Sequence, residues 1–448
     1  MALLAEPARQ HRGAVAIFLL TFLAYNANGR EIGSYDSAPT ALAARELLLR
    51  GTLTLNHVVG ATPEYATRWG FIQGADGSYR SVYSPVPSVA AAVLMWPLAR
   101  AGIVDLRAPL AHRLIAKATA SILVSAAAVL VYLASCSFVS RRRALAVAFA
   151  FSLGTGLWST ASQTLWQTET TVFGLALATL ALVGPSERAT WRTATVFGVG
   201  LMLAGMARPQ VAPAIAVLLV SVWWRWRWSH AALATLLVGS GAAGMAWLNG
   251  QWFGHPLGPL PLLSDVNGRI HATASTFGLH SEALAGLLVS PSRGLLVFSP
   301  VVLIALAAMP RAIRLGWKSP FAWIVLAVLG QYLLYASYSV WWGGHTFGPR
   351  YLLDLLPLLA ALGTLALTTP WPAVARFAAS AALTWSVGVA ATGAFCYPHD
   401  AWNTDPIDVD RHHRRLWDVK DNQIVRCWNR GTSPQNFSLF SSLAVRRR

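Results

Sequence analysis

Residues 114 to 139 read LIAKATASILVSAAAVLVYLASCSFV and contain one charged side chain, Lys117. A helix of about 20 mainly apolar residues is long enough to cross the ~30 Å hydrocarbon core of a bilayer. Three arginines, Arg141, Arg142 and Arg143, follow this stretch, as is typical of a helix end on the cytoplasmic side of a membrane. The stretch therefore predicts a membrane-spanning helix in an integral membrane protein.

Comparable apolar stretches recur along the chain, whose 448 residues are 55% hydrophobic and only 12% charged. So little charge cannot cover a soluble globule. The candidate spans are residues 13–28, 114–139, 144–160, 168–183, 193–207, 210–224, 231–249, 295–310, 320–339, 351–368 and 373–395. The stretch 85–101 is short and begins with Pro85 and Pro87, so we expect a juxtamembrane or re-entrant helix there. The predicted fold is all-α and polytopic, with about eleven transmembrane helices.

The basic residues of the short loops indicate how the chain is oriented. With a cytoplasmic N-terminus, the inner loops hold thirteen basic residues and only two acidic ones, Glu6 and Glu187. The thirteen are Arg9, Arg12, Arg141, Arg142, Arg143, Arg188, Arg192, Arg225, Arg227, Arg311, Arg314, Lys318 and Arg376. Because cytoplasmic loops are enriched in lysine and arginine, this bias predicts an N-terminus inside and a C-terminus outside.

Three long segments then lie on the outer side of the membrane. They are the loops 29–113 and 250–294 of a transmembrane domain over 1–395, and a short tail over 396–448. Cys396 and Cys427 both fall in that tail, where an oxidising compartment permits a disulfide. A bridge and two free thiols are equally compatible with this spacing.

The net charge of +17 also fits a nucleic-acid-binding protein when it is taken alone. Here the basic residues are spread over many short loops, and no nucleic-acid-binding motif accompanies them. The aromatic and basic run from Trp223 to Trp228 ends a predicted span, where an interfacial aromatic belt explains it better than a base-stacking strip. We therefore interpret the charge as membrane topology and expect no nucleic-acid partner.

One carboxylate, Asp36, lies just beyond the first predicted span, ahead of an amphipathic helix pattern over 41–50. A carboxylate held at the membrane surface can take a proton from an acceptor hydroxyl while a sugar is transferred to it. An aspartate at this spacing equally well caps a helix or a turn. Its nearest other carboxylate along the chain is Glu31.

Three arginines, Arg208, Arg293 and Arg350, each stand at the outer end of a predicted span. A guanidinium can bind phosphate there in a bidentate manner without deep burial in lipid. Each could instead reach an ordinary lipid headgroup or pair with Glu169 or Asp354. As a set on one face, they predict a site for an anionic, lipid-bound ligand.

A single histidine, His345, stands after two glycines that let a ligand approach the backbone. Its imidazole can donate a hydrogen bond or act as an acid, although a loop histidine is more often a polar surface residue. No histidine, cysteine and carboxylate pattern has metal-site spacing, so we expect no metal ligand set and leave assistance by a divalent cation open. The chain also contains no P-loop, nucleophile elbow or dinucleotide fingerprint.

Five short segments together resemble the GT-C superfamily of membrane glycosyltransferases, in its branch of protein O-mannosyltransferase-like and RgtA/B/C/D-like bacterial proteins. The segments are Ser34-Tyr35-Asp36-Ser37, Tyr83-Ser84-Pro85-Val86-Pro87, Thr164-Leu165-Trp166-Gln167, Ser292-Arg293-Gly294 and Gly343-Gly344-His345-Thr346-Phe347-Gly348-Pro349-Arg350-Tyr351. The resemblance covers most of the chain. The residues expected to support the site are Tyr35, Tyr83, Trp166, Gln167 and Glu169.

The resemblance implies a polyprenyl-phosphate-linked sugar as donor and a first-loop acidic residue as catalytic base. It also implies a site on the non-cytoplasmic face of a bacterial inner membrane. Asp36 matches the position of the base, and the donor phosphate would be held by Arg208, Arg293, His345 and Arg350. Many members carry an adjacent acidic pair in this loop, whereas Asp36 has no acidic neighbour. The acceptor would be a hydroxyl of a lipid, a glycan or a protein.

Two other functions compete with sugar transfer. A transporter or flippase of a lipid-linked substrate predicts charged residues deep within the spans, but here Lys117 and Asp354 lie within about a turn or two of a span end. A catalytically inactive scaffold of the same fold would keep the lipid site, and the lone loop-one aspartate permits it. Release of polyprenyl phosphate from a sugar donor distinguishes transfer from both.

Overall fold

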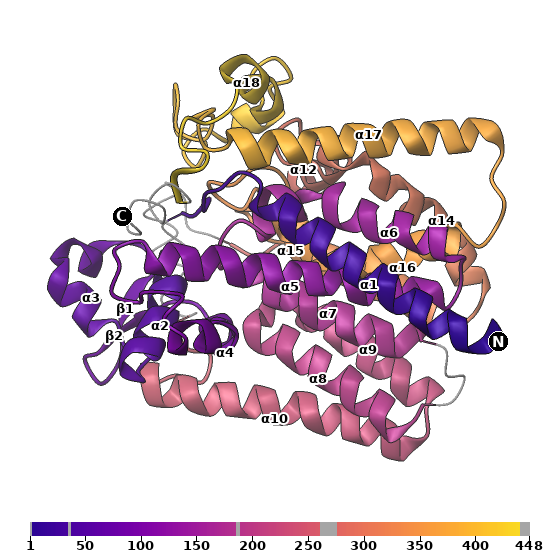
Figure 1. Cartoon of the computed structure of the whole chain (residues 1–448), viewed down its shortest axis with the longest axis horizontal. Helices are drawn as coiled ribbons and strands as arrows, with labels where there is room; N and C mark the ends of the chain where they lie inside the picture. The colour runs from indigo at the N-terminus through magenta and orange to yellow at the C-terminus, as the bar shows by residue number, and fades with distance from the viewer. Residues whose placement is uncertain (1, 35–36, 185–188, 260–275, 440–448) are drawn as a thin grey trace.

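The computed structural model describes residues 2–34, 37–184, 189–259 and 276–439. Figure 1 shows long helices lying side by side, with small helices, a hairpin and the C-terminal segment gathered at one end. The long helices are α1 (Ala2–Asn26), α5 (Ala111–Cys136), α6 (Arg141–Leu153), α7 (Thr168–Val183), α8 (Trp191–Ala207), α9 (Ala212–Arg225), α10 (Trp228–Phe253), α14 (Leu303–Arg314), α15 (Pro320–Ala336), α16 (Leu356–Ala366) and α17 (Ala373–Cys396). The fold of the described residues is helical apart from one two-stranded sheet.

Helical elements cover most of each of the eleven stretches expected to span the membrane. Three helices, α5, α10 and α17, are long and apolar enough to cross a membrane. Three others, α4 (Val86–Arg100), α7 and α15, are apolar but shorter, as is the stretch Pro209–Arg225. The chain is therefore a membrane protein with at least some helices of full spanning length.

Prolines and glycines divide several of the expected spans into shorter helical pieces. The span beginning at residue 295 consists of α13 (Leu295–Phe298), η4 (Pro300–Val302) and α14. Pro300 has no N–H to donate and a fixed φ, so it begins a new helical segment rather than continuing α13. Similarly, Gly154 ends α6 before the π-helical turn η2 (Leu157–Ala161).

Small residues let the central helices approach one another closely. α5 packs on α1, α6 and α7, α7 packs on α8, and α8 packs on α10. At the contact of α7 and α8, a Cβ added to Gly174 would lie 2.5 Å from the carbonyl oxygen of Gly200, and the converse distance is 2.6 Å. Neither glycine tolerates a side chain there, which is typical of close helix packing in membranes.

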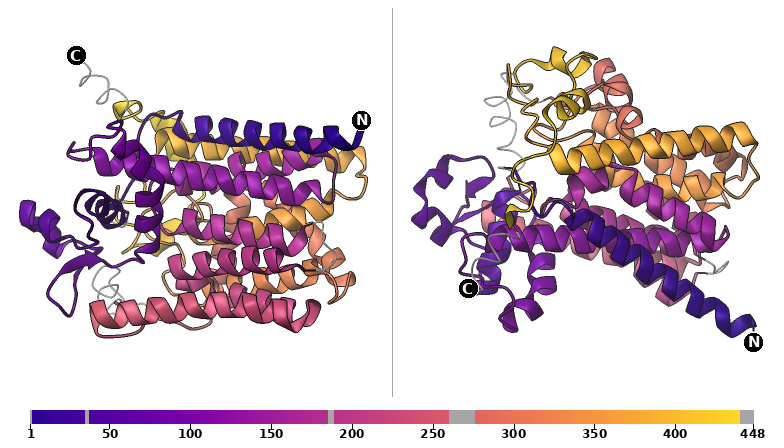
Figure 2. Two further views of the ribbon diagram at one scale, coloured as in Figure 1. Left: turned by 60° about the horizontal axis from the view of Figure 1, so that its bottom comes forward. Right: turned by 45° about the horizontal axis from the view of Figure 1, so that its top comes forward.

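The first loop is a compact subdomain at one end of the bundle (Figures 1 and 2). It contains α2 (Ala38–Arg50), α3 (Asn56–Ala61), η1 (Pro63–Thr67), β1 (Phe71–Gln73), β2 (Tyr79–Ser81) and α4. The strands are antiparallel, and Gly77 in the connecting turn has a φ of +79°. α4 occupies the stretch expected to form a short helix and packs on α2 and α5.

The C-terminal segment returns to the same end of the bundle. It contains η6 (His413–Trp417) and α18 (Gln423–Arg430). The Phe437 N–H donates to the carbonyl of Asn28 at 2.8 Å, and the Arg30 guanidinium donates to the carbonyl of Tyr397 at 2.7 Å. The tail therefore packs against the start of the first loop, whereas the N-terminus of α1 lies at the far end (Figure 1).

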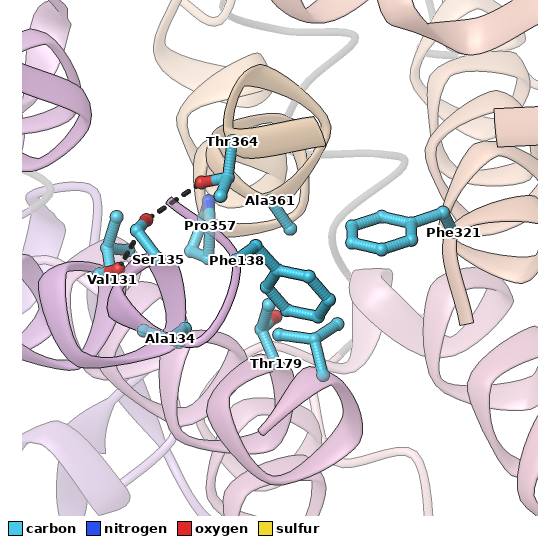
Figure 3. Close-up of a pocket in the computed structure, with 11 residues that line it drawn as sticks. Val131, Ala134, Ser135, Phe138, Thr179, Phe321, Pro357, Ala361 and Thr364 are labelled. Carbon is cyan, nitrogen blue, oxygen red and sulfur yellow. Dashed lines mark hydrogen bonds between the residues drawn. The ribbon is translucent and has the colours of Figure 1, made fainter. Parts of the chain in front are cut away.

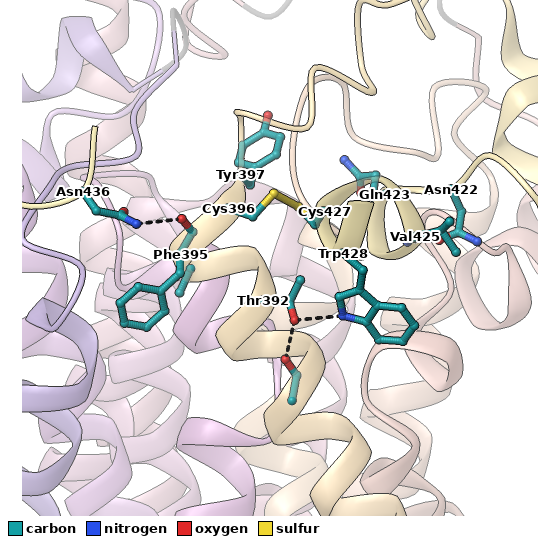
Figure 4. The surroundings of a disulfide bond; sticks show 12 residues. Thr392, Phe395, Cys396, Tyr397, Asn422, Gln423, Val425, Cys427, Trp428 and Asn436 are labelled. Carbon is teal, nitrogen blue, oxygen red and sulfur yellow. Dashed lines mark hydrogen bonds between the residues drawn. A yellow bond between two sulfur atoms is a disulfide. The ribbon is translucent and has the colours of Figure 1, made fainter. Parts of the chain in front are cut away.

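Cys396 and Cys427 form a disulfide that ties α18 to the end of α17 (Figure 4). Trp428 adds to this contact, because its indole N–H donates to the hydroxyl of Thr392 at 3.3 Å. The chain between the two cysteines has no regular structure apart from η6 and the start of α18. The disulfide therefore restrains a segment with little secondary structure of its own.

We expect Cys427→Ser to lower the free energy of unfolding of the tail by about 3 kcal/mol, because the open chain regains the entropy of an unclosed loop. Limited proteolysis of the protein in detergent micelles measures this as faster cleavage between α17 and α18. Cys136→Ser is the matched control, since Cys136 is a free thiol at the C-terminal end of α5 and takes no part in the disulfide. Equal cleavage rates for the two variants would contradict a stabilising role of the bridge.

Candidate functional site

A cavity of about 1040 Å³ lies where the first loop, the ends of the long helices and the tail meet. Its wall contains many polar and charged side chains. It includes Glu31, Ser34, Ser37, Tyr65, Arg68, Trp69, Tyr83, His112, Arg113, Gln167, Arg208, Tyr338, His345, Arg350, Tyr351, Tyr397, Asp408, Asp410 and Arg411. Segments that are hundreds of residues apart in the chain therefore contribute to one site.

The first loop contributes the carboxylate of Glu31 to the cavity. Glu31 lines the cavity and is mostly buried. One of its oxygens accepts from Arg113 Nε at 3.1 Å, and the other accepts a short hydrogen bond from the hydroxyl of Thr164. Ser34 and Ser37 line the same wall. Tyr35 and Asp36, which the sequence singles out, lie outside the described residues.

Arg350 enters the cavity wall at the start of η5 (Arg350–Leu355). Its Cζ lies 4.9 Å from the ring centroid of Trp166 and 5.7 Å from that of Tyr351, so the guanidinium is held over aromatic faces. Tyr83 and Gln167 line the cavity beside Arg208 and Arg350, and these four also line a small side pocket with Trp166. Five of the predicted supporting and phosphate-binding residues thus meet at the side pocket.

Arg208 also lines the cavity, but its guanidinium is committed to a buried ion pair. Nη1 lies 3.0 Å from Oδ2 of Asp354 and 3.2 Å from the hydroxyl of Thr168. Burial is the largest single influence on the pKa of Arg208 and acts to lower it, but Asp354, Tyr335 and Tyr351 together outweigh burial and raise the pKa above the usual value. Pairing of Arg208 with Asp354 is one of the alternatives that the sequence allows. The Nε of Arg208 is buried with no hydrogen-bond partner among the described residues.

Glu169 lies close to this ion pair but not in the cavity wall. It is fully buried in the first turn of α7. The residues that line the cavity and the side pocket do not include it. A supporting role for Glu169 would therefore act through the buried charges of Arg208 and Asp354 and not by contact with a ligand.

The prediction that Arg293 binds phosphate is not supported by its surroundings. Only 1% of the residue is exposed, and it is not among the residues lining the cavity. Its guanidinium donates to the carbonyls of Trp342, Ser292 and Gly344 and to the side chains of Gln423 and Asn403, at 2.7–3.0 Å. These five bonds use all five N–H groups of an arginine. Arg293 is therefore a structural residue that joins the α15–η5 loop to the tail.

His345 lines the cavity, but it faces carboxylates. Its Nε2 lies 3.1 Å from Oδ1 of Asp408 and 3.3 Å from Oδ2 of Asp410. Two carboxylates beside the ring oppose an anion at this position. These surroundings do not favour the predicted contact between His345 and a donor phosphate.

Two other pockets are apolar and share no lining residue with the cavity. The pocket in Figure 3 has a volume of only about 10 Å³ and lies between α5, α7, α15 and α16. The hydroxyls of Ser135 and Thr364 hydrogen-bond to each other beside it at 2.8 Å. It is at the opposite end of α5 from Arg113 and holds at most about one water molecule. The other, of about 350 Å³, lies between α6, α14, α16 and α17.

Several cavity residues are not distinguished by the sequence. Arg113 becomes a partner of Glu31 only in the fold, because 82 residues separate the two. The same is true of Asp408, Asp410 and Arg411 in the tail. The abundance of charged residues in the tail indicates that some of them belong to a site, but their spacing does not indicate which of them reach the cavity.

Comparisons with known proteins identify the fold but not a family. No protein-family model matches the sequence, and no curated protein matches it either. The structure is similar to that of the Archaeoglobus fulgidus oligosaccharyltransferase tethered with an acceptor peptide containing the NVT sequon, at 12% identity and a TM-score of 0.50, over 90% of this chain and 58% of that chain. The form of the same enzyme in complex with Zn and sulfate matches at 12% identity and a TM-score of 0.51, over 90% and 57%. The chain thus spans a little over half the length of that enzyme.

A lower score relates the chain to ArnT from Cupriavidus metallidurans bound to undecaprenyl phosphate. The identity is 14%, the TM-score is 0.48, and 85% of this chain and 74% of that chain are covered. This TM-score is too low to establish a shared fold. The likeness to the oligosaccharyltransferase, in contrast, shows that the chain has the GT-C fold that the sequence motifs indicate.

Proposed function

We propose that this chain is a membrane glycosyltransferase, which moves a sugar from a polyprenyl-phosphate-linked donor to an acceptor hydroxyl on the non-cytoplasmic face. The observation that carries the proposal is the cavity in a GT-C fold. It combines guanidinium groups, from Arg208 and Arg350, with a first-loop wall that holds the carboxylate of Glu31. Cationic groups suit a phosphate, and a carboxylate suits a hydroxyl that must lose a proton.

The proposed topology has eleven crossings, with the N-terminus in the cytoplasm of a bacterial cell and the C-terminal tail outside the inner membrane. Residues 1–395 form the transmembrane domain, and residues 396–448 form the outer tail. The first loop and the tail lie at one end of the bundle, opposite the start of α1 (Figure 1), which supports one outer face. The arginine cluster at the start of α6 lies at the other end of α5 from Arg113, as a positive inner side requires.

In the proposed reaction the acceptor oxygen attacks the anomeric carbon of the sugar. The bond from that carbon to the phosphate oxygen breaks, and its electron pair stays on the phosphate. A first-loop carboxylate takes the acceptor proton, for which we propose Asp36. Arg350 and Arg208 stabilise the negative charge that develops on the leaving polyprenyl phosphate, and this stabilisation is the largest contribution expected of such a site.

The acceptor of the proposed reaction is a hydroxyl of a glycan, a lipid or a protein. The tail contributes Tyr397, Asp408, Asp410 and Arg411 to the cavity wall. We propose that these residues contact the acceptor, because the first loop and Arg350 form the side at which the donor phosphate would be held. The enzyme that shares the fold was crystallised with an acceptor peptide, and this chain spans only part of its length.

The test is release of polyprenyl phosphate from a panel of polyprenyl-phosphate sugars by the protein reconstituted in vesicles with candidate acceptors. Neither a flippase nor an inactive scaffold breaks that bond, so absence of release across the panel contradicts the proposal. Transport of intact donor without release would favour a flippase instead.

We expect Arg350→Ala to weaken donor binding by about 10- to 100-fold, the worth of one charge-assisted phosphate contact. Equilibrium binding of polyprenyl phosphate to the protein in detergent micelles measures it. Arg350→Lys keeps the charge but not the bidentate fork, so an intermediate affinity is expected. Arg314→Ala is the matched control, because Arg314 is exposed at the end of α14 and outside the cavity wall. An affinity unchanged by Arg350→Ala would exclude this guanidinium from the phosphate site.

A further inference from the structure

We propose that His345, Asp408 and Asp410 form a binding site for one divalent cation in the cavity wall. Each residue offers one ligand atom, and these three atoms all lie within 4.8 Å of one another. His345 comes from the α15–η5 loop and the two aspartates come from the tail, so only the tertiary structure assembles the cluster. Nothing in the proposed transfer step requires it, and the proposal stands independently of that step.

The distances fit ligands that share an ion. The imidazole Nε2 lies 3.1 Å from Oδ1 of Asp408 and 3.3 Å from Oδ2 of Asp410. At metal–ligand distances of about 2.1–2.2 Å, neighbouring ligand atoms of one ion lie about 3.0–3.5 Å apart. A single N–H on that nitrogen cannot be well aligned with both carboxylate oxygens at once. A cation accepts the lone pairs of all three atoms together.

The groups behind the cluster hold the ligands in position. The indole N–H of Trp342 donates to Oδ1 of Asp410 at 2.6 Å, and this leaves Oδ2 directed at His345. The backbone N–H of Asp410 donates to Oδ1 of Asp408 at 2.8 Å, so the two aspartates are fixed relative to each other. Outer-shell bonds of this kind orient the ligands in known metal sites.

The loop that carries the histidine is also held rigidly. Arg293 donates to the carbonyls of Trp342 and Gly344, both at 3.0 Å, on either side of Gly343. Gly343 and Gly344 have φ values of +75° and +72°, which favour glycine, so this turn depends on both. The turn presents His345 to the tail in one orientation.

Charge and exposure also fit an ion that remains open to the cavity. Two carboxylates outweigh one imidazole in charge, whichever state the ring is in. The side chain of Asp410 is 10% exposed, whereas those of His345 and Asp408 are 36% and 40% exposed, so open coordination positions face the cavity. One nitrogen and two oxygens suit Mn²⁺, Fe²⁺ or Zn²⁺ better than Ca²⁺, which takes oxygen ligands. The cation would add positive charge to the cavity that Arg350 also lines.

The test uses Mn²⁺ as the probe and the full chain, purified in detergent and stripped with a chelator. The electron paramagnetic resonance signal of free Mn²⁺ falls when the ion binds, which gives the stoichiometry and the affinity. We expect one ion per chain, and at least a tenfold weaker affinity in Asp408→Asn and in Asp410→Asn. Asp418→Asn is the matched control in the same tail, because Asp418 is exposed and lies outside the cluster, and its affinity should equal that of the unchanged chain.

Asparagine keeps one side-chain oxygen, so Asp410→Asn can still accept the bond from Trp342 and the tail is expected to fold. Size-exclusion chromatography and thermal unfolding of each variant verify this. Absence of Mn²⁺ binding to the unchanged chain, or an affinity that neither substitution lowers, would overturn the proposal and leave the cluster as an ion pair. The readout involves no sugar transfer, so failure of the proposed activity leaves this result interpretable.

Discussion

Asp36→Asn is expected to lower the rate of sugar transfer by about 10²- to 10⁴-fold, the range that a general base contributes. The amide cannot take the acceptor proton, but it has nearly the same size and still accepts hydrogen bonds. Binding of polyprenyl phosphate should therefore be unchanged. Single-turnover transfer in vesicles, compared with equilibrium binding of polyprenyl phosphate, separates the two effects.

Glu31→Gln is the comparison that distinguishes the two first-loop carboxylates. Glu31 already accepts hydrogen bonds from Arg113 and Thr164, so its lone pairs are less available to an acceptor hydroxyl. We expect its substitution to lower the rate by less than that of Asp36. Glu64→Gln is the matched control, because Glu64 is exposed in the same loop, pairs with Arg68 and is not in the cavity wall.

The transfer rates of the two variants identify which carboxylate is the base. A large loss in Glu31→Gln with a normal rate in Asp36→Asn would transfer the role of base to Glu31. Normal rates in both variants would falsify acid–base chemistry by the first loop.

Arg293→Ala is expected to lower the free energy of unfolding by about 3–5 kcal/mol, or to prevent folding of the tail. The substitution removes five hydrogen bonds and leaves buried acceptors without a donor, each of which costs about 1–3 kcal/mol if water cannot reach it. It also removes a guanidinium whose Cζ lies 5.3 Å from the ring centroid of Trp402. Burial lowers the pKa of Arg293 to about 10, so the group stays charged at neutral pH.

Thermal unfolding in detergent micelles measures the loss, and limited proteolysis locates it in the tail. Arg293→Lys should be destabilised as well, because an ammonium has three donors on one atom and cannot reach the same five acceptors. The control Arg314→Ala should change the stability by less than about 0.5 kcal/mol, as usual for an exposed position. A stable Arg293→Ala variant that loses affinity for polyprenyl phosphate would instead restore the phosphate-binding role expected from the sequence.

Arg208, Arg293 and Arg350 could not be told apart by their positions in the sequence. All three stand at span ends and look equivalent in the sequence. In the structure Arg350 lines the cavity with its guanidinium over the ring of Trp166, and Arg208 pairs with Asp354. Arg293 is saturated by five acceptors, two of which belong to the tail. Their roles depend on partners that are distant in the chain. For Arg293 and Asn403, the separation is 110 residues.

The sequence by itself determined that this is a helical membrane protein, because apolar stretches of spanning length can satisfy their backbone hydrogen bonds in lipid only as helices. α5 is the clearest case, and the stretch beginning with Pro85 and Pro87 also predicted the short helix α4. The motifs also indicated the GT-C fold, in agreement with the structural comparison.

The tertiary structure alone decided which charged side chains meet. The ion pair of Arg208 with Asp354, the two partners of Glu31 and the cluster around His345 all join segments far apart in the chain. Local propensity and periodicity describe neighbours within a few residues, whereas the energy of a charge in a membrane protein depends on whichever partner the packing brings within about 4 Å. A pattern along the chain can therefore predict the bundle, but not the chemistry at the end where the cavity lies.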